Sequence, residues 1–495
     1  MTQKLLNTLK NSDVEIWLVG GALRNHILKK PIKDLDFSVK ASIPKCANFA
    51  KSVSKKLKAP CFPLDEERGI WRISLKNAVT LDFSPLKEDI KTDLMSRDFT
   101  VNSFALPVKE ISNISLTKKG CVSLKIKSKT SVLDYCEGFK DIEKKRIRTP
   151  NKNNFKEDPL RLLRAFRFAA ELGFSIDKKT LKEIKSKADL ISSCAKERIK
   201  EELLKIFATS ISSKIIQEMK KSGLLFQIFP QLKEQETCAE IYYGKGGVLK
   251  HTINVLKRAD LFFSSPLKYM PAYKNFGFKQ ENIPLLKLAA LLHDIAKPST
   301  AKEINGRLRF FGHEEKGAAI SYKILKDLKF SNEEIRFICR IIGQHLRIGN
   351  IAHSEVISQK AMFKIFSDLG ESASGLIILS WTDHASYISE KKIFKSLDKM
   401  KKKPFKIPLK GLPKTGFIKT LRFIQVVNLI AKNYSLRKKD FQAKSILDGN
   451  EIMKILSIPP GPKVGEIIRR IKFIQFQGKI KTKKEAESYI KTLKI

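Results

Sequence analysis

The chain has 495 residues, more than a single hydrophobic core usually organises, so we expect three or four domains. Its 96 Lys and Arg outnumber 51 Asp and Glu, a formal net charge of +45 that favours a nucleic-acid partner, although a Lys-biased genome would give the same excess. No apolar run reaches the ~20 residues of a membrane span, and the seven Cys are scattered without a CxxC pair, so we expect a cytoplasmic protein that does not cross a membrane.

The first ~110 residues are predicted to form a small mixed α/β domain. The apolar run Val14–Val19, the helical stretch Ala22–Leu28 and the run Leu35–Val39 give the order strand, turn, helix, strand. Two more strand-like runs follow at Ile70–Leu75 and Val79–Phe83.

A glycine turn joins the first predicted strand to its helix. Gly20 and Gly21 allow backbone N–H groups to approach a phosphate, and the start of the helix favours the phosphate charge. Arg24 lies one turn into the helix and can reach the same anion. A Gly-Gly turn alone is more often structural, so this signal needs support.

Two carboxylates follow on the next predicted strand. Asp34 and Asp36 are two residues apart, so both side chains project from the same face, which is unfavourable unless cations lie between them. Such a pair suits Mg²⁺ ions that activate a 3′-hydroxyl and stabilise a leaving pyrophosphate. Asp82, on the strand Val79–Phe83, is a candidate third carboxylate. The alternative is an exposed edge strand with ordinary surface acids.

From Asp158 the pattern is helical nearly to the end. The first helix of this part has apolar residues at helical spacing and ends at Gly173. Residues 118–132 are predicted to form a loop or hairpin, Lys399–Pro413 a linker, and 452–493 a final helical segment broken at Pro459. Further helices are predicted at 196–208, 213–221, 249–263, 284–296, 315–328 and 332–345.

Four polar residues recur every three positions along the helix that ends at Gly173. They are Asp158, Arg161, Arg164 and Arg167, and this spacing places them along one slowly turning face. An Asp acceptor beside an Arg donor can pair with the Watson–Crick edge of C or A. Taken alone, the stripe is better explained as a solvated arginine face.

These motifs together resemble one known family. LVGGALRN followed by DLDFSV, then Arg97–Asn102 (RDFTVN) and Glu157–Arg167 (EDPLRLLRAFR), is similar to the bacterial and eukaryotic tRNA nucleotidyltransferase and poly(A) polymerase family. Asp134, Gly138 and Asp141 resemble the hinge between its head and neck domains. The motifs occur in the family's order over about 150 residues.

The resemblance implies an α+β enzyme with a mixed α/β head and helical neck, body and tail. It implies two-metal transfer from CTP and ATP to the 3′ end of tRNA, with Asp34 and Asp36 as the Mg²⁺ ligands. It assigns Arg97, Asp98 and Asn102 to ribose and phosphate contacts. It assigns recognition of the incoming base to Asp158 and Arg161, and it places Arg164 and Arg167 near the base and the triphosphate.

The chain departs from the family pattern in four respects. Asn25, Ser96 and Ser103 replace a usual Asp, Arg and Ala, and none of these positions is a predicted metal ligand. Only fourteen residues separate Asp82 from Arg97, where many CCA-adding relatives carry a longer, Arg-containing loop associated with the switch from C to A. This short connection makes CC-only addition an alternative, although some relatives are naturally short here.

A second constellation lies in the helical part. The pair His293-Asp294 follows the apolar run of the predicted helix 284–296, and burying both is unfavourable without a cation. With His251 and Asp383, the order H…HD…D resembles the HD-domain phosphohydrolases, which implies a divalent metal that activates water. Two more residues, His313 and His345, match accessory positions of some HD proteins. The alternative is an inherited helical module that supports tRNA.

We therefore predict a head at residues 1–148, a neck at 149–235, an HD domain at 236–395, and a linker with a helical tail at 396–495. Basic side chains make the tail a candidate surface for tRNA phosphates: Lys463, Arg469, Arg470, Lys472, Lys479, Lys481, Lys483 and Lys484. The predicted function is addition of C and/or A to tRNA. The alternatives are a poly(A) polymerase and an HD phosphohydrolase whose head only binds RNA. The sequence leaves the oligomeric state open.

Overall fold

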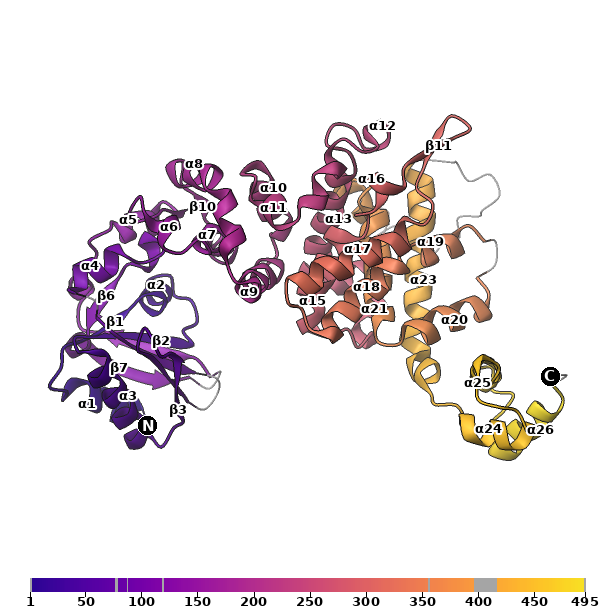
Figure 1. The fold of residues 1–495 in the computed structure, drawn as a ribbon, viewed down its shortest axis with the longest axis horizontal. Coiled ribbons are helices and arrows are strands. Elements are labelled where there is room, and N and C mark those ends of the chain that lie inside the picture. Colours follow the sequence, from indigo (N-terminus) through magenta and orange to yellow (C-terminus); the bar gives the residue numbers. More distant parts are fainter. Residues whose placement is uncertain are drawn as a thin grey trace. The chain divides into compact units, whose positions relative to one another are not determined.

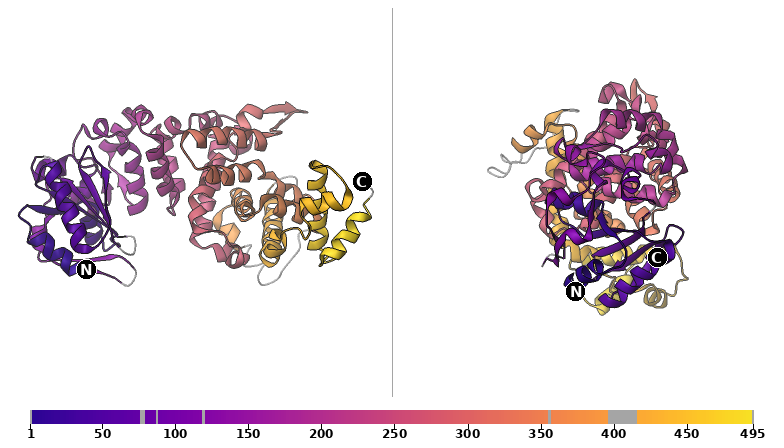
Figure 2. Two further views of the ribbon diagram at one scale, coloured as in Figure 1. Left: turned by 60° about the horizontal axis from the view of Figure 1, so that its bottom comes forward. Right: turned by 90° about the vertical axis from the view of Figure 1, so that its left-hand side faces the viewer.

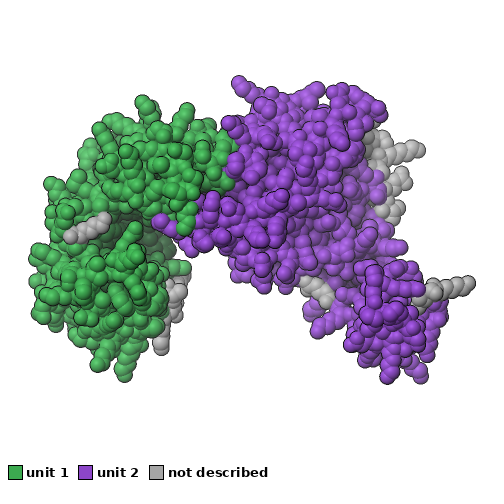
Figure 3. Space-filling model, viewed as in Figure 1, with its two compact units in different colours: residues 1–195, 219–228 green, residues 196–218, 229–495 purple. Residues whose placement is uncertain are grey.

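The computed structural model describes residues 2–75, 79–86, 88–117, 120–354, 357–395 and 416–493. The chain divides into two compact units, which we describe separately: unit 1 is residues 1–195 and 219–228, and unit 2 is residues 196–218 and 229–495 (Figure 3). The predicted linker Lys399–Pro413 lies outside the described residues. The predicted fold class is confirmed, because a mixed α/β head is followed by helices (Figure 1).

Unit 1 begins with a six-stranded mixed sheet, ordered β3-β4-β5-β2-β1-β6. Strands β2 and β5 are parallel neighbours, and the other neighbouring pairs are antiparallel. The four strands predicted from the sequence are β1, β2, β4 and β5, with ends shifted by one or two residues. The strands are β1 (Ile16–Val19), β2 (Asp34–Val39), β3 (Cys61–Asp65), β4 (Ile70–Ser74), β5 (Thr80–Pro85) and β6 (Ala105–Pro107).

Side-chain alternation gives the central strands one apolar and one polar face. Leu35, Phe37 and Val39 of β2 are buried, and Phe37 stacks on Phe83 of β5 with ring centroids 5.1 Å apart. Phe49 of helix α3 (Ile43–Leu57) packs edge-on against Phe83. The carboxylates of β2 and β5 alternate with these apolar residues and therefore project from the opposite face.

Short helices and a hairpin complete the head. Helix α2 (Gly21–Ile27) follows the glycine turn, and helix α4 (Ile90–Met95) follows β5 closely. Strands β7 (Ile111–Leu116) and β8 (Val122–Ile126) pair as a hairpin, one of the two forms predicted for residues 118–132. The remaining short elements are α1 (Thr2–Lys10), η2 (Thr100–Asn102), η3 (Val108–Glu110), η4 (Lys129–Ser131) and α5 (Gly138–Glu143).

Helix α7 (Arg161–Leu172) carries the predicted arginine stripe. It ends at Gly173, whose φ of 73° is left-handed, as the sequence predicts. The other elements of unit 1 are α6 (Asn154–Glu157), β9 (Arg146–Ile147), β10 (Ser175–Ile176), α8 (Lys178–Ser186), η5 (Ala188–Ser193) and α11 (Leu224–Ile228).

In its described residues, unit 2 is helical apart from the hairpin β11 (Lys302–Ile304) and β12 (Arg307–Arg309) (Figure 1). A buried ion pair links two central helices, because Lys287 Nζ lies 2.6 Å from Asp260 Oδ1. Its main helices are α9 (Lys196–Phe207), α10 (Ser212–Lys221), α13 (Gly247–Ser264), α15 (Ile283–Leu292), α17 (His313–Asp327), α18 (Asn332–Gly343), α20 (Gln359–Leu369), α21 (Ser372–Ala385) and α23 (Phe417–Gln442). Shorter helices are η6 (Pro230–Leu232), η7 (Glu234–Glu236), α12 (Glu240–Tyr243), α14 (Pro266–Tyr269), η8 (Pro271–Asn275), η9 (Gln280–Asn282), α16 (Lys297–Thr300) and α19 (Leu346–Ala352).

The last three helices, yellow in Figure 2, have a small apolar core of their own, formed by residues between Leu447 and Ile490. They are α24 (Gly449–Leu456), α25 (Pro462–Phe476) and α26 (Lys483–Lys491), so the predicted break near Pro459 is confirmed. Asp448 and Thr482 cap the N-termini of α24 and α26, respectively, and each forms a capping box. Within the described residues, none of the helices is long and apolar enough to span a bilayer.

Candidate functional site

A cavity of about 580 Å³ in unit 1 gathers the head and neck residues predicted from the sequence. All thirteen line it: Gly20, Gly21, Arg24, Asp34, Asp36, Asp82, Arg97, Asp98, Asn102, Asp158, Arg161, Arg164 and Arg167. Three lining residues were not predicted: Arg72, Ser96 and Phe168. Residues more than a hundred positions apart in the chain therefore share one site.

The carboxylates of β2 and β5 lie side by side in this cavity. Asp36 is directly opposite Asp82 in the parallel register, and Asp34 is opposite Thr80, whose Oγ1 donates to Asp34 Oδ1 at 2.8 Å. Burial, reinforced by the Asp82 carboxylate, raises the pKa of Asp36 to about 6. A carboxylate with a raised pKa gains from a nearby cation, and hard divalent cations prefer oxygen ligands. The residues present therefore fit a Mg²⁺ site.

Asp82, the candidate third carboxylate, forms an ion pair with Arg72. Arg72 lies opposite Asp82 across the β4–β5 ladder and binds it in a bidentate way, with Nε at 2.8 Å and Nη2 at 2.6 Å. Both Asp82 oxygens therefore already have a cationic partner, whereas neither Asp34 nor Asp36 has an arginine bound in this way. A direct metal contact of Asp82 would require Arg72 to release at least one oxygen.

The glycine turn brings backbone close to the carboxylates. Gly20 has a φ of 73°, and a Cβ atom there would lie 3.0 Å from Arg97 Nη1 and 3.5 Å from Asp36 Oδ2. Another residue would be strained and would crowd both charged groups. The turn therefore brings its backbone next to the Asp36 carboxylate and the Arg97 guanidinium, and the Gly20 N–H itself donates to the Phe104 carbonyl at 3.1 Å.

A buried chain of hydrogen bonds crosses the cavity from α2 to α7. Arg24 donates to Asn102 Oδ1, Asn102 Nδ2 donates to Asp98 Oδ1 at 2.9 Å, and Arg164 Nε donates to Asp98 Oδ2 at 3.1 Å. Burial acts to raise the pKa of Asp98, but Arg164 and Asn102 outweigh it and hold the value below the usual range. Burial lowers the pKa of Arg24 to about 10, so this guanidinium is still charged at neutral pH.

Asn25 also contacts Arg24. Its Oδ1 accepts from Arg24 Nε at 3.1 Å and Nη2 at 3.0 Å, and its Nδ2 donates to the Pro31 carbonyl. The Asn that replaces the family's Asp therefore keeps the acceptor for Arg24 but adds no negative charge.

Phe168 separates the arginines of the cavity. Its ring lies 3.8 Å from the guanidinium carbon of Arg167, 5.2 Å from that of Arg24 and 5.4 Å from that of Arg164. Cation–π contact lowers the cost of holding three positive groups in one place. Sequence reasoning missed Phe168 because an apolar residue on α7 reads as core.

Of the predicted base-pairing pair, Arg161 is the first residue of α7, whereas Asp158 lies three residues earlier in extended backbone. The prediction that Asp158 belongs to this helix is therefore wrong. Asp158 Oδ1 accepts from the Leu160 amide at 3.2 Å, and Arg161 donates to the carbonyls of Ser96 and Asn154 and to Glu157. Both side chains line the cavity, but the guanidinium of Arg161 is held by protein acceptors. Pairing with a base would replace some of these bonds.

The predicted hinge motif braces the same region. Asp141 is fully buried and accepts from Thr100 Oγ1, Arg146 and Arg148. A Cβ atom on Gly138 would lie 2.4 Å from the Thr100 carbonyl. The motif thus fixes the segment that carries Asn102, and Asp134 caps α5 through the amides of Gly138 and Phe139.

Unit 2 contains a second cluster, formed by the predicted HD residues. His251, His293 and Asp383 offer ligand atoms within 4.8 Å of one another, and Asp294, His313 and His345 form an equal group. Asp294 joins the groups: its Oδ2 lies 3.5 Å and 3.2 Å from Nε2 of His251 and His293, and its Oδ1 lies 3.4 Å and 3.7 Å from Nε2 of His313 and His345. His313 and His345 are therefore about as close to Asp294 as His251 and His293 are.

The orientation of the imidazoles fits a metal. Nδ1 of His293, His313 and His345 lies 2.6–2.9 Å from backbone carbonyl oxygens, which accept only, so Nδ1 carries the proton and a neutral ring has its lone pair on Nε2. Nε2 of His313 and Nε2 of His345 face each other at 3.2 Å. Two lone pairs at this distance repel unless a cation lies between them.

The buried charges of the cluster lead to the same conclusion. Asp294 Oδ1, Asp383 Oδ1 and His293 Nε2 are buried and make no hydrogen bond to the described part of the chain, whereas Asp294 Oδ2 is paired with Lys297 Nζ at 2.7 Å. Burial acts to raise the pKa of Asp294, but His293 and Lys297 outweigh it and hold the value well below the usual range. Burial, with the neighbouring His293, lowers the pKa of His345 to about 3. Ionised carboxylates beside a neutral imidazole are suitable ligands for a divalent transition metal.

One prediction about this region needs correction. The helix predicted at 284–296 ends at Leu292, so His293 and Asp294 lie in the turn that follows α15, where the chain can aim both side chains at one point. His353, which was not predicted as a ligand, lies outside both groups and is packed edge-on against Phe423.

Sequence reasoning missed three residues around the cluster. Tyr243 and Tyr387 stack on the ring of His251, with centroids 4.8 Å and 5.1 Å away. Lys297 Nζ lies 2.7 Å from Asp294 Oδ2 and donates to Tyr243 Oη at 2.9 Å. Lys297 follows Asp294 by three residues, which is the one spacing signal that could have indicated it.

Three protein-family models match the chain. The Poly A polymerase head domain matches residues 16–148, the HD domain matches residues 248–400, and a probable RNA and SrmB-binding site of polymerase A matches residues 173–236.

Similar proteins extend over nearly the whole chain. A Deinococcus radiodurans protein named A-adding tRNA nucleotidyltransferase is 25% identical over 481 residues, covering 96% of this chain and 94% of that protein. A Thermus thermophilus protein named CC-adding tRNA nucleotidyltransferase is 26% identical over 491 residues, covering 95% and 92%. A solved structure of a CCA-adding enzyme in apo form aligns with a TM-score of 0.59 at 17% identity, covering 100% of this chain and 94% of that one, which shows a shared fold.

Proposed function

Because the chain belongs to the tRNA nucleotidyltransferase and poly(A) polymerase family of enzymes and carries an HD domain, we propose that it adds C and/or A to the 3′ end of tRNA without a template. CTP and ATP are the substrates. The observation that carries this proposal is the cavity in which all thirteen predicted head and neck residues meet. In it, Asp34 and Asp36 lie with a glycine turn and several arginines.

In the proposed reaction, different residues of the cavity bind the metal and the phosphates. The 3′-hydroxyl of the tRNA loses its proton to water, its oxygen forms a bond to the α-phosphorus, and the bond from that phosphorus to pyrophosphate breaks. Asp34 and Asp36 would hold Mg²⁺, which when bound supplies Lewis acidity at the attacking hydroxyl and the triphosphate. The N–H group of Gly21 and the guanidinium of Arg24 receive phosphate charge.

The α7 side of the cavity selects the base. Asp158 and Arg161 present an acceptor and a donor edge, and Asp98 fixes Arg164 beside them. The protein would thus replace the template strand. The hydrogen bonds that now hold Arg161 to Ser96 and Asn154 would be exchanged for contacts with C or A.

The nucleotide order is open to CCA, CC-only or A-only addition. The connection from β5 to α4 is short, which favours a CC-adding enzyme, whereas the near-full-length relatives include proteins named for A-adding and for CC-adding activity. Purified full-length protein should be incubated with tRNA lacking its terminal CCA and with each labelled NTP. Two C and one A indicate complete CCA addition, and C alone or A alone indicates a partial enzyme. Long A tails would indicate the poly(A) polymerase alternative, and no incorporation would contradict the proposal.

A second activity is favoured by the cluster around Asp294. We propose that unit 2 binds divalent metal through His251, His293, Asp294 and Asp383, with His313 and His345 completing the group that faces Asp294 Oδ1. The buried Oδ1 of Asp294, which makes no hydrogen bond to the described part of the chain, supports this proposal. When bound, the metal supplies Lewis acidity and an activated water.

The reaction of this second centre would be hydrolysis of phosphate esters at RNA ends. Water adds to phosphorus, the bond to a ribose oxygen breaks, and that oxygen gains a proton. Ends with a 2′,3′-cyclic phosphate or a 2′-phosphate are the proposed substrates, because their removal prepares RNA for nucleotide addition. Replacement of His293 and Asp294 should abolish the hydrolysis and spare nucleotide addition.

The proposal also includes a tRNA contact through the basic tail and a location in the cell. Lys463, Arg469 and Arg470 are exposed on α25, where they can contact tRNA phosphates. A cytoplasmic location is part of the same proposal, since all seven cysteines are free.

A further inference from the structure

A row of opposed side chains crosses the face of the head sheet that carries the proposed metal ligands. Asp36 of β2 is directly opposite Asp82 of β5, and Asp82 is directly opposite Arg72 of β4. Arg72 is in turn opposite Phe62 of β3, the edge strand of the sheet (Figure 1). Because directly opposed residues point to the same face of a sheet, Phe62 lies on the face of the metal ligands.

The edge strand leaves an apolar surface open on this face. Phe62 is 42% exposed, and Leu64, two residues further along β3, is 45% exposed. On the opposite face, Trp71 of β4 is covered by α3, whose Lys51 Nζ lies 4.7 Å from the centre of the Trp71 ring. The open side chains of β3 therefore adjoin Arg72, which lines the head cavity, and are not part of the core.

The proposed phosphate site sets the direction from which the RNA must approach. In the proposed transfer, the attacking and leaving oxygens lie roughly in line, on opposite sides of the phosphorus. Gly21 and Arg24, which we propose to receive phosphate charge, belong to α2, and α2 follows β1. Strand β1 adjoins β2 on one side, and β5, β4 and β3 follow on the other. Pyrophosphate that leaves on the β1 side therefore requires the 3′-hydroxyl to attack from the side of Arg72 and Phe62.

Arg72 supplies positive charge on this side. Asp82 accepts from its Nε and Nη2, whereas its Nη1 makes no hydrogen bond with the described residues. The Arg72 side chain is 33% exposed. Its remaining N–H groups can therefore bind a phosphate of the RNA backbone while the guanidinium stays paired with Asp82.

Phe62 is near enough to the reacting atoms for one RNA end to reach both. Three strand spacings of about 4.8 Å place Phe62 roughly 14 Å from Asp36 along the sheet. Successive nucleotides of a stacked strand are about 3.4 Å apart, so the last few nucleotides cover this distance. A base can thus stack on Phe62 while the 3′-hydroxyl lies at the metal ligands.

The occupant that these features fit is a single RNA strand. Aromatic rings that stack on bases, together with cations that follow the backbone, bind single strands with little sequence preference. A strand of a second protein chain fits less well, because Pro63 lacks an N–H and the register of β3 shifts between Pro63 and Asp65.

We propose that the face of β3 and β4 binds the single-stranded 3′ end of the tRNA, with a base stacked on Phe62 and a backbone phosphate on Arg72. This surface rests on the proposed nucleotidyltransferase function, because the direction of attack sets which strands the RNA covers. Phe62 would bind the acceptor RNA and not the incoming CTP or ATP.

Photocrosslinking with the full-length protein tests the contact directly. Three tRNAs lacking CCA carry 4-thiouridine at the last, second-last or third-last position, and each complex is irradiated in EDTA, where no addition occurs. At least one of them should crosslink to the tryptic peptide 59–68, which contains Phe62. Phe62→Ala should reduce this crosslink roughly fivefold or more and leave crosslinks to other peptides in place. Crosslinks that all map to other peptides would overturn the proposal.

Steady-state kinetics give a second readout, which separates RNA binding from a structural role. Phe62→Ala should raise KM for tRNA lacking CCA roughly fivefold or more and leave KM for the nucleotide within twofold. Phe62→Tyr keeps an aromatic ring and should stay within twofold of the wild type in both. A loss of kcat with unchanged KM for tRNA, or an equal loss in Phe62→Tyr, would contradict a stacking contact.

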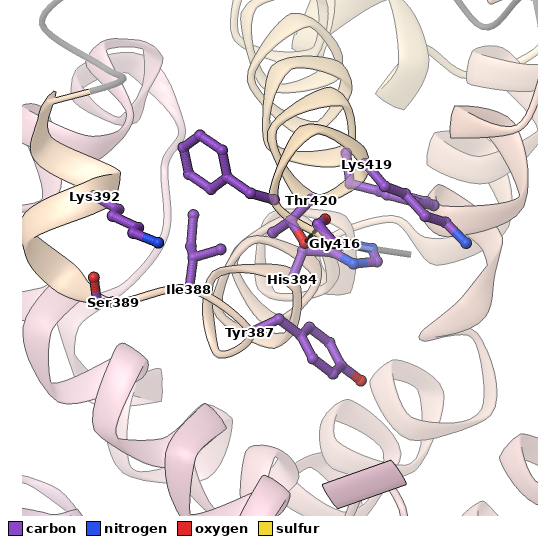
Figure 4. Close-up of a pocket in the computed structure, with 10 residues that line it drawn as sticks. His384, Tyr387, Ile388, Ser389, Lys392, Gly416, Lys419 and Thr420 are labelled. Carbon is purple, nitrogen blue, oxygen red and sulfur yellow. Dashed lines mark hydrogen bonds between the residues drawn. The ribbon is translucent and has the colours of Figure 1, made fainter. Parts of the chain in front are cut away.

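Two exposed residues provide matched controls. Phe417 is 38% exposed and lines a cavity of about 610 Å³ (Figure 4), whose described lining belongs to unit 2. Arg68 is exposed in the same β3–β4 hairpin as Arg72 but does not line the head cavity. Phe417→Ala and Arg68→Ala should keep KM for tRNA within twofold of the wild type, whereas Arg72→Ala should raise it roughly fivefold or more. Equal effects of Arg72→Ala and Arg68→Ala would overturn the assignment of Arg72.

The RNA surface and the proposed function can fail separately. If the wild type adds no nucleotide but its crosslink maps to peptide 59–68, the surface stands and the nucleotidyltransferase function fails. If the wild type adds nucleotides and Phe62→Ala matches it in both assays, the function stands and the surface is wrong.

Discussion

Arg164 of helix α7 donates to the buried carboxylate of Asp98, and the other oxygen of that carboxylate accepts from Asn102. Because Asn102 also accepts from Arg24, the side proposed to bind phosphate and the side proposed to select the base share one hydrogen-bond network. The family motifs RDFTVN and EDPLRLLRAFR therefore act as one structural unit, although about sixty residues separate them.

We predict that Asp98→Ala slows nucleotide addition by roughly 10–100-fold, because it leaves Arg164 and Asn102 without their shared acceptor. Asp98→Asn keeps an acceptor and should lose less. Steady-state kinetics with CTP and ATP should show the loss in both kcat and KM. An alanine variant within twofold of the wild type would show that the network does not position the arginines.

The raised pKa of Asp36 predicts a pH-dependent stability of the metal-free protein. The pKa is about 6 in the fold against 3.8 ordinarily, so the folded state holds the proton more tightly. This contribution is fully present below pH 3.8 and is lost as the pH rises through 6. In EDTA, the wild type should lose roughly 1–3 kcal/mol of stability relative to Asp36→Asn between pH 5 and pH 7.

Denaturant titration at each pH measures this difference, and added Mg²⁺ should restore the wild type but not the variant. A difference that is the same at pH 5 and pH 7 would show that Asp36 does not carry this charge penalty.

Removal of metal should separate the two proposed centres. Elemental analysis of the purified protein should find a divalent transition metal, and the combined variant His293→Ala and Asp294→Ala should lose it. Nucleotide addition with excess Mg²⁺ should stay within threefold of the wild type. His353→Ala is the control, because His353 lies outside both ligand groups. Metal retained by the combined variant would contradict the assigned ligands.

The buried pair of Lys287 and Asp260 should support the stability of unit 2. Lys287 is 1% exposed, and Asp260 also accepts from Ser212 Oγ and the Ser213 amide. Lys287→Met leaves a buried carboxylate without its cation, which should cost about 3–5 kcal/mol. Lys279→Met removes one partner of an exposed pair with Glu281 and should cost less than ~1 kcal/mol. Urea unfolding followed by circular dichroism compares the two, and equal costs would contradict this account.

Residues with strong local signals could be predicted from the sequence. The alternation of β2 placed Asp34 and Asp36 on one face, and Gly173 ended α7 as expected. The cavity could not be derived from local patterns, because the pairing of Arg72 with Asp82 depends on the register of β4 against β5. Its predicted members came from motifs, and Arg72 belongs to none of them.

Helix α21 was not predicted because it is buried almost all round. Twelve of its fourteen residues are buried, so no apolar stripe marks one face. Its Asp383 was assigned from the order of HD residues along the chain, and the packing that brings Tyr243 and Tyr387 against His251 left no sequence signal.

The central claim is that Asp34 and Asp36 hold the metal that drives nucleotide addition. Single-turnover addition of labelled nucleotide to tRNA lacking CCA, measured at increasing Mg²⁺, tests it most directly. The wild-type rate should rise and saturate with Mg²⁺, whereas Asp36→Ala should lose at least a thousandfold while still binding tRNA. An Asp36→Ala enzyme whose rate stays within tenfold of the wild type at saturating Mg²⁺ would contradict the account.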